Sequence, residues 1–236
     1  SKWVNFLGFH FHVGSQLFDN APYLAALEVV LGLVREVRRR FGHTVAELNL
    51  GGGYGVRYTE SDPHIDIEEN IRLLSAYLKK RCTELGLAMP AILMEPGRSI
   101  VADAGLTLYT VGTVKKIPGY KNYVSVDGGM SDNPRYALYR SKYTVLLASR
   151  PEAEADLFCD VVGRCCESDD VIQPDVLLPE PERGEILAVC TTGAYNYSMA
   201  SNYNRLARPA MVMLTEASDY LAVRRESLDD LVRNDI

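Results

Sequence analysis

Three short apolar segments alternate with two helical patterns over the first hundred residues, and this alternation is the strongest constraint on the fold. The apolar segments are residues 3–13, 45–50 and 91–94. Between them, residues 23–41 and 67–85 carry apolar side chains at helical spacing. The signals expected at the helix ends are Pro22, Gly42, Asp66 and Gly86. Strands that alternate with helices of this length predict parallel βα units, and therefore an α/β fold.

Each expected strand ends in residues that can carry chemistry. The endings are His12-Val13-Gly14-Ser15, Gly51-Gly52-Gly53 and Glu95-Pro96-Gly97-Arg98. Parallel strands end at one edge of a sheet, where α/β folds place their active sites. Taken singly, each ending also has a structural explanation: the glycines as a flexible turn, the histidine as a core residue, and the Glu-Arg pair as a surface ion pair.

Taken together, the endings predict a site for pyridoxal phosphate. Glycine loops let backbone N–H groups approach a phosphate, and Arg98 or Ser15 can add further donors. The imidazole of His12 can stack on a flat ring. Glu95 can accept a hydrogen bond from a protonated ring nitrogen and hold that charge in place.

Composition excludes several classes of function. The chain has 236 residues, 47% of them apolar, and a net charge of -6. Interspersed acids and bases argue against a nucleic-acid or anionic-membrane surface. The longest apolar run, Tyr23 to Val34, contains Glu28 and is shorter than the ~20 residues of a membrane span. Five scattered cysteines without C-x-x-C spacing predict no metal site and a reducing, cytoplasmic compartment.

From about residue 107 the pattern changes to short strands separated by turns, which predicts a separate antiparallel β-rich domain. The expected domains are 1–106 and 107–236. Small helices are expected at 198–202 and 227–232, and residues 174–184 are expected to form an acidic, proline-rich loop. The expected strands are 106–114, 122–128, 143–149, 157–163, 185–193 and 209–216.

Three loops of this domain carry polar residues that an isolated β-domain would not require. Asp132-Asn133-Pro134-Arg135 precedes Tyr139, Cys165-Cys166-Glu167-Ser168 follows a strand, and Thr192-Gly193-Ala194-Tyr195 ends another. Each could equally be a turn with a surface charge. Considered together with the strand endings, however, the arginines can bind a carboxylate of a substrate, and the glutamate can pair with an ammonium group.

The chain resembles the pyridoxal-phosphate-dependent amino-acid decarboxylases with an alanine-racemase-like fold. The resemblance rests on six motifs in the family's order: GFHFHVGSQ, LNLGGGYG, MEPGRSIVADAG, VDGGMSDNPRYALY, GRCCESDD and TTGAYNYSMASNYN. It implies the last three strands of a (β/α)₈ barrel, followed by a β-rich barrel-like or sandwich-like domain. It also implies a homodimer with active sites at the subunit interface.

The resemblance also implies site residues. Those for the cofactor are His12, Ser15, Gly51, Gly52, Gly53, Glu95, Gly97, Arg98 and Tyr195, and those for the substrate are Arg98, Arg135, Tyr139, Glu167 and Tyr195. Cys166 and His12 would be catalytic, with Cys166 protonating the carbanion left by carbon dioxide. Cys166 and Glu167 would come from the neighbouring subunit. Without the resemblance, Cys166 could be a buried structural cysteine.

Within the family, the likeness is to the branch that converts meso-diaminopimelate to L-lysine and carbon dioxide. An amino-acid group at each end of this substrate gives Arg135 a distal carboxylate to bind. A decarboxylase for ornithine, arginine or carboxynorspermidine, or a non-catalytic homologue that binds pyridoxal phosphate, remain the alternatives. The chain departs from the usual pattern at Asp169 and Asn196, where the family more often has glycine.

One expected feature has no match in the chain. The family holds its cofactor through a Schiff-base lysine near the start of the barrel, whereas the lysines here lie elsewhere; they are Lys2, Lys79, Lys80, Lys115, Lys116, Lys121 and Lys142. Three βα units cannot close an eight-stranded barrel. We therefore expect the chain to be the C-terminal part of such an enzyme, and to be inactive alone.

Overall fold

The computed structural model describes residues 3–236 and divides them into two compact units. The first contains the residues up to 57 together with 61–101, and the second contains 58–60 and 102–236. Lys2, one of the seven lysines considered above, lies outside the described residues. The expected domain boundary after residue 106 stays a prediction.

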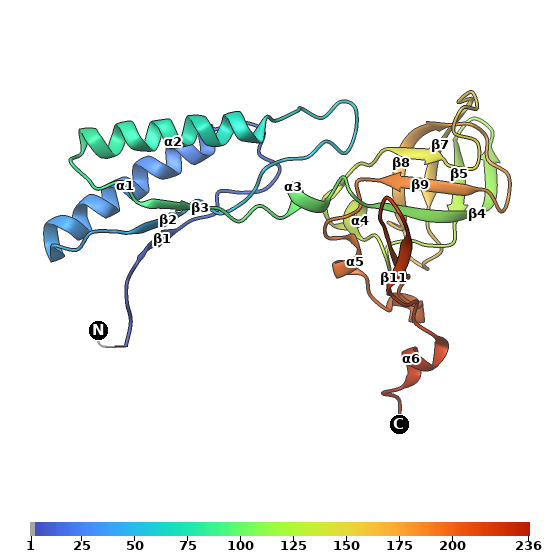
Figure 1. Cartoon of the computed structure of the whole chain (residues 1–236). Helices are drawn as coiled ribbons and strands as arrows, with labels where there is room; N and C mark the ends of the chain where they lie inside the picture. Colours follow the sequence, from blue (N-terminus) through green and yellow to red (C-terminus); the bar gives the residue numbers. More distant parts are fainter. Residues whose placement is uncertain (1–2) are drawn as a thin grey trace. The chain divides into compact units, whose positions relative to one another are not determined.

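The first unit is a parallel three-stranded sheet with two helices on one face (Figure 1). The order across the sheet is β1 (Gly8–His10), β2 (Glu47–Asn49) and β3 (Ala91–Leu93), and the helices are α1 (Ala21–Phe41) and α2 (Ile67–Glu84). The expected parallel βα units are confirmed. The first strand is shorter than residues 3–13, because only three of those residues pair with β2.

The ends of both helices follow the sequence signals. Pro22 lies in the first turn of α1, and Gly42 follows its last residue in the left-handed conformation, at φ 62°, which suits glycine. Asp66 caps α2 by accepting a hydrogen bond from the backbone N–H of Glu69. These signals act locally, which is why they could be read from the sequence.

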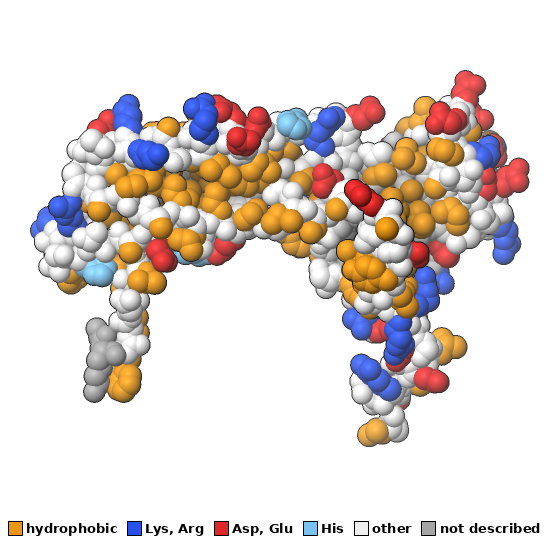
Figure 2. Space-filling view, in the orientation of Figure 1, with side chains coloured by type: hydrophobic (Ala, Val, Ile, Leu, Met, Phe, Trp, Pro, Cys, Tyr) orange, Lys and Arg blue, Asp and Glu red, His pale blue; other side chains and the backbone are white. Residues whose placement is uncertain are grey.

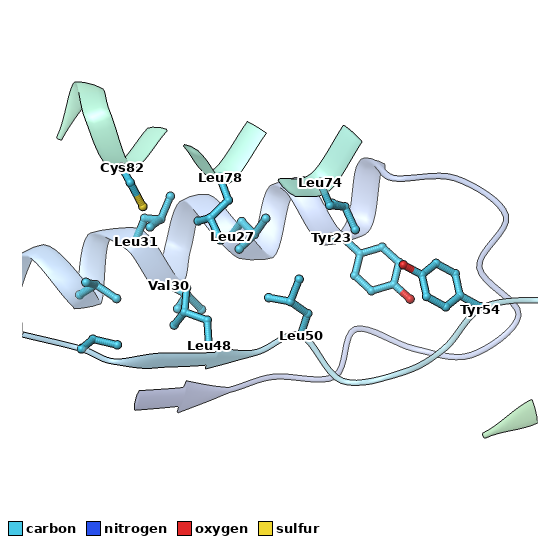
Figure 3. Packing of buried hydrophobic residues seen from close by; sticks show 12 residues of the cluster. Tyr23, Leu27, Val30, Leu31, Leu48, Leu50, Tyr54, Leu74, Leu78 and Cys82 are labelled. Atoms are coloured by element: carbon cyan, nitrogen blue, oxygen red, sulfur yellow. The ribbon is translucent and has the colours of Figure 1, made fainter. Parts of the chain in front are cut away.

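A single apolar layer lies between the helices and the sheet (Figure 3). Leu27 and Leu31 of α1 meet Leu74 and Leu78 of α2 beside Leu48 of β2, and none of the five is more than 2% exposed. Burial of a leucine side chain stabilises a fold by about 1.5–3 kcal/mol. The strand partners of Leu48 pack against the same layer; they are Phe9 and Ile92.

The second unit is built on a six-stranded sheet of order β6-β9-β4-β5-β7-β8. The strands are β4 (Leu106–Ile117), β5 (Lys121–Val126), β6 (Val145–Leu147), β7 (Leu157–Val162), β8 (Val171–Leu178) and β9 (Ile186–Cys190). The β-rich class is confirmed, but the expectation of a purely antiparallel domain is wrong. β5 and β7 run parallel, because a long connection through β6 separates them along the chain.

Short elements complete both units. α3 (Arg98–Val101) follows β3, and the second unit adds α4 (Arg135–Tyr139), α5 (Asn196–Met199), the 3₁₀ turn η1 (Tyr203–Arg205), β10 (Met211–Leu214), β11 (Asp219–Val223) and α6 (Leu228–Val232). The helix expected at 198–202 therefore begins two residues earlier and ends three residues earlier. The α6 helix begins after Ser227, whose side chain and that of Asp230 form a reciprocal cap.

The expectation of a loop over residues 174–184 is wrong for its first five residues, which belong to β8. Pro174 lacks a backbone N–H and is tolerated in a strand only at a sheet edge or a bulge. Both conditions hold, because β8 is an edge strand and its pairing with β7 shifts between Cys159 and Val161. Asp175 adopts a left-handed conformation at the same place.

The β10–β11 hairpin is a separate two-stranded sheet. Its apolar side chains are largely exposed, and Figure 2 shows them as an orange area over the hairpin; they include Val212, Met213, Leu214, Tyr220 and Leu221.

Among residues 3–236, none of the helices is apolar over the length that a bilayer would require.

An ion pair joins the two helices of the first unit. Glu28 on α1 accepts hydrogen bonds from Arg81 Nε at 2.7 Å, Arg81 Nη2 at 2.8 Å and the Tyr77 hydroxyl at 2.7 Å. Arg81, and then Tyr77, lower the pKa of the Glu28 carboxyl from 4.5 to about 2.

We predict that Glu28→Gln lowers stability at pH 7 by less than about 1 kcal/mol, because solvent screens this half-exposed pair. The folded state favours the carboxylate, so its contribution is complete above pH 4.5 and disappears as the pH falls toward 2. The urea midpoints of the two proteins should therefore differ at pH 7 and converge in acid. Equal midpoints at pH 7 would contradict this prediction.

Candidate functional site

The three strand endings of the first unit meet at one edge of its sheet. The backbone N–H of Glu95 donates to the carbonyl of Gly51 at 2.8 Å, and that of Leu17 donates to the carbonyl of Gly53 at 2.9 Å. The glycine triplet therefore lies between the segments that follow β1 and β3. His12 lies against Gly51, where its Nδ1 would be 3.0 Å from a Cβ atom at that glycine.

The glycines are required here because the backbones approach closely. A Cβ atom on Gly52 would lie 2.1 Å from the carbonyl oxygen of Glu95, and one on Gly53 would lie 2.2 Å from that of Gly14. Gly97 differs, since a Cβ atom there would meet open space. Close packing of the strand endings accounts for Gly52 and Gly53 before any ligand is considered.

The Glu95 carboxylate is held by two residues that sequence reasoning did not select. Asn49 Nδ2 donates to Glu95 Oε1 at 2.7 Å, and His10 Nε2 lies 3.4 Å from Glu95 Oε2. Asn49 Oδ1 also accepts from the N–H of Gly51 at 2.9 Å. The alternation of side chains along a strand could have identified both residues, because it places His10 on the same face as His12 and Asn49 on the same face as Gly51.

Ser15 and Arg98 form a second contact at the same edge. Arg98 Nη2 donates to Ser15 Oγ at 2.9 Å, and Arg98 is buried at the start of α3. The alternative explanation of Glu95 and Arg98 as a surface ion pair is not supported, because Arg98 is buried and the Glu95 carboxylate contacts His10 and Asn49.

In the second unit, the structure brings together Arg135, Tyr139 and Tyr195. Arg135 is 8% exposed, and its guanidinium carbon lies 4.9 Å from the ring centre of Tyr139 and 5.2 Å from that of Tyr195. Aromatic faces attract a guanidinium electrostatically. Arg135 Nη2 donates a long hydrogen bond, 3.5 Å, to Ser141 Oγ.

No carboxylate of the described residues forms an ion pair with this buried guanidinium, and its Nε has no hydrogen-bond partner there. Burying an unpaired charge is costly, so the arrangement suits an anion that arrives from elsewhere. The neighbouring Asn196 is also buried and accepts a long hydrogen bond, 3.4 Å, from the Tyr143 hydroxyl.

Cys166 and Glu167 lie in the loop between β7 and β8. Cys166 is exposed, so the reading of it as a buried structural cysteine is wrong. The adjacent Cys165 is buried, which raises the pKa of its thiol. Asp169, one of the two departures from the family pattern, forms an ion pair with Arg140 at 3.0 Å and so links this loop to the end of α4.

Two buried aspartates organise this loop and its neighbour. Asp170 accepts backbone hydrogen bonds from Met130 at 2.6 Å and from Cys165 at 2.5 Å, one on each carboxylate oxygen. Asp132 accepts from the N–H of Gly129 at 2.8 Å and from the Tyr109 hydroxyl. Burial is the main reason that the pKa of Asp132 is raised.

We predict that Asp170→Asn destabilises the protein by about 1–3 kcal/mol, because an amide nitrogen then faces a backbone N–H and leaves it unsatisfied. Asp132→Asn is the matched control. It should cost less, since the Tyr109 hydroxyl can accept from the new amide while Gly129 keeps its acceptor. Thermal unfolding of both variants tests this order, and an equal or larger loss for Asp132→Asn would contradict it.

Comparison with known proteins identifies the family. Residues 1–102 match the pyridoxal-binding domain of the pyridoxal-dependent decarboxylases. A diaminopimelate decarboxylase of Bacillus subtilis is 44% identical over 236 residues, which is 100% of this chain and 54% of that protein. The chain thus spans about half the length of the curated relatives it matches.

Solved structures show the same relationship. A diaminopimelate decarboxylase from M. jannaschii has a TM-score of 0.90 and 33% identity, with 98% of this chain and 52% of that chain covered. A lysine/ornithine decarboxylase from Vibrio vulnificus, complexed with putrescine, has a TM-score of 0.69 and 26% identity, covering 84% of this chain and 52% of that chain. The chain therefore belongs to the pyridoxal-dependent decarboxylases.

Proposed function

We propose that this chain supplies the C-terminal part of an enzyme that uses pyridoxal phosphate to convert meso-diaminopimelate to L-lysine and carbon dioxide. The observation that carries the proposal is the buried Arg135, which has aromatic neighbours but no acidic partner among the described residues. A substrate with a distal carboxylate supplies that partner, whereas ornithine or arginine does not. The relatives named diaminopimelate decarboxylase support the same choice.

The residues at the sheet edge of the first unit fit the cofactor. Ser15, Arg98 and the backbone N–H of Gly97, where the surroundings are open, are suitable donors for a phosphate. Glu95 is half-exposed, and a carboxylate with two partners keeps lone pairs for a third, such as a protonated ring nitrogen. The donors and the carboxylate thus match the two charged ends of pyridoxal phosphate.

Different residues of this edge bind the phosphate, the ring and the ring nitrogen of the cofactor. Ser15, Arg98 and the N–H groups of Gly52, Gly53 and Gly97 bind the phosphate, together with Tyr195, while the N–H of Gly51 already donates to Asn49. His12 stacks on the ring. Glu95 keeps the ring nitrogen protonated, while Asn49 and His10 hold its carboxylate in place.

The substrate residues bind its two ends. Arg135 and Arg98 bind carboxylate, Glu167 pairs with the distal ammonium, and Tyr139 and Tyr195 donate hydroxyl hydrogen bonds. Pyridoxal phosphate, when bound, supplies an electron sink for the pair of electrons left by carbon dioxide. The Cys166 thiol then gives its proton to the substrate carbon, and its exposure leaves it accessible for this step.

We further propose a cytoplasmic homodimer in which Cys166 and Glu167 reach the partner's active site. The exposed position of both residues is compatible with such a role. All five cysteines are free, as a reducing compartment requires.

We predict that Arg135→Met in the full gene product lowers kcat/KM for diaminopimelate about 10²–10³-fold, mainly through KM, because the substrate carboxylate loses its buried partner. Arg183→Met, at an exposed arginine between β8 and β9, is the matched control and should leave kcat/KM unchanged. Carbon dioxide release is the measurement. Release from ornithine or arginine but not from diaminopimelate would overturn the proposed function.

We also predict that the 236 residues alone show no turnover and bind pyridoxal phosphate weakly at most. The three-stranded sheet leaves two edges and one face without barrel walls, so the cofactor residues are not held in register. The test adds pyridoxal phosphate and borohydride to the purified chain, maps modified lysines by mass spectrometry, and measures carbon dioxide release. Turnover together with stoichiometric labelling of one lysine would contradict this prediction.

A further inference from the structure

The turn η1 contacts both residues of the loop to which chemistry is assigned. Asn204 Oδ1 accepts a hydrogen bond from the backbone N–H of Cys166 at 2.6 Å. The Tyr203 hydroxyl donates to Glu167 Oε2 at 3.1 Å, and the other oxygen of Glu167 accepts from the N–H of Ser168 at 2.9 Å. One turn therefore fixes a main-chain position beside the thiol and a side-chain carboxylate.

The turn has a defined shape of its own. Asn204 has φ 54° and ψ 24°, a left-handed conformation that asparagine tolerates better than most residues. Just before the turn, the N–H of Ser201 donates to the carbonyl of Ser131 at 2.7 Å. Asn202 Nδ2 donates to Glu226 Oε2 at 2.6 Å, and the same carboxylate binds Arg208. The turn is thus anchored on both sides of Tyr203 and Asn204.

The loop is held from a second direction as well. The N–H of Cys165 donates to Asp170, and the N–H of Cys166 donates to Asn204, so two successive backbone donors are bound by side chains from different segments. The backbone of Cys166 is therefore fixed, although its thiol is exposed.

We propose that Asn204 and Tyr203 are positioning residues for the decarboxylation, Asn204 fixing the backbone that carries the Cys166 thiol and Tyr203 fixing the Glu167 carboxylate. The inference rests on the proposed function, in which Cys166 delivers a proton and Glu167 binds the substrate ammonium. Neither positioning residue touches the substrate. Both act by reducing the number of positions that the two functional groups occupy before the reaction.

The first experiment measures positioning without activity. Hydrogen exchange of the Cys166 amide is followed in the wild-type chain and in Asn204→Gly, which keeps the positive φ but removes the acceptor. We expect exchange to become about tenfold faster, as for the loss of one ordinary hydrogen bond. Asn204→Asp keeps an acceptor and should restore the slow rate. An unchanged rate in Asn204→Gly overturns the role of Asn204.

The second experiment separates the two residues by their kinetics in the full gene product. Tyr203→Phe should raise KM for diaminopimelate about tenfold with little change in kcat, because only the ammonium-binding carboxylate loses a partner. Asn204→Gly should lower kcat with little change in KM, and Asn204→Asp should restore kcat. Tyr220→Phe, at an exposed tyrosine of β11, is the control. Equal changes of kcat and KM in both variants overturn the assignment.

Together, the two experiments show whether the proposed function or the positioning roles have failed. A wild-type protein that is inactive on diaminopimelate overturns the proposed function, while the exchange rates still report whether Asn204 holds the loop. An active wild-type protein with unchanged exchange and unchanged kinetics in all variants overturns the positioning roles alone.

Discussion

The complete burial of Leu48 determines which way the candidate site residues of the first unit point. Leu48 lies at the centre of the layer between the sheet and the two helices, and its partners Phe9 and Ile92 face the same layer. Because side chains alternate along a strand, the next residues in register face the other side. His10 and Asn49 therefore lie beside Glu95, which extends that face beyond β3.

Much of this unit could be predicted because its signals are local. Proline, glycine and aspartate at the helix ends, and polar residues at the strand ends, indicate structure within a few positions of themselves. The contacts of Glu95 could not be predicted in the same way, since they depend on the register in which Asn49 pairs with Leu93. Strands of only three residues do not fix that register by themselves, so the packing of the helices determines it.

The second unit was harder to predict for a related physical reason. The loops that carry its candidate site residues are held by contacts between distant parts of the chain, such as Asp170 with Met130, 40 residues apart, and Asn204 with Cys166, 38 residues apart. The motif residues were visible in the sequence, but their supports were not. The parallel pairing of β5 with β7 likewise depends on where the chain returns to the sheet, and no local pattern reports that.

Pro174 has a consequence beyond the shape of β8. An edge strand normally presents a row of free backbone donors and acceptors, which another chain can extend into a continuous sheet. Here the missing N–H of Pro174, the shifted pairing around Asp160 and the left-handed Asp175 interrupt that row in the middle of the strand. The opposite edge strand, β6, pairs over only three residues. Both margins of the six-stranded sheet are therefore poor templates for edge-to-edge pairing with another chain.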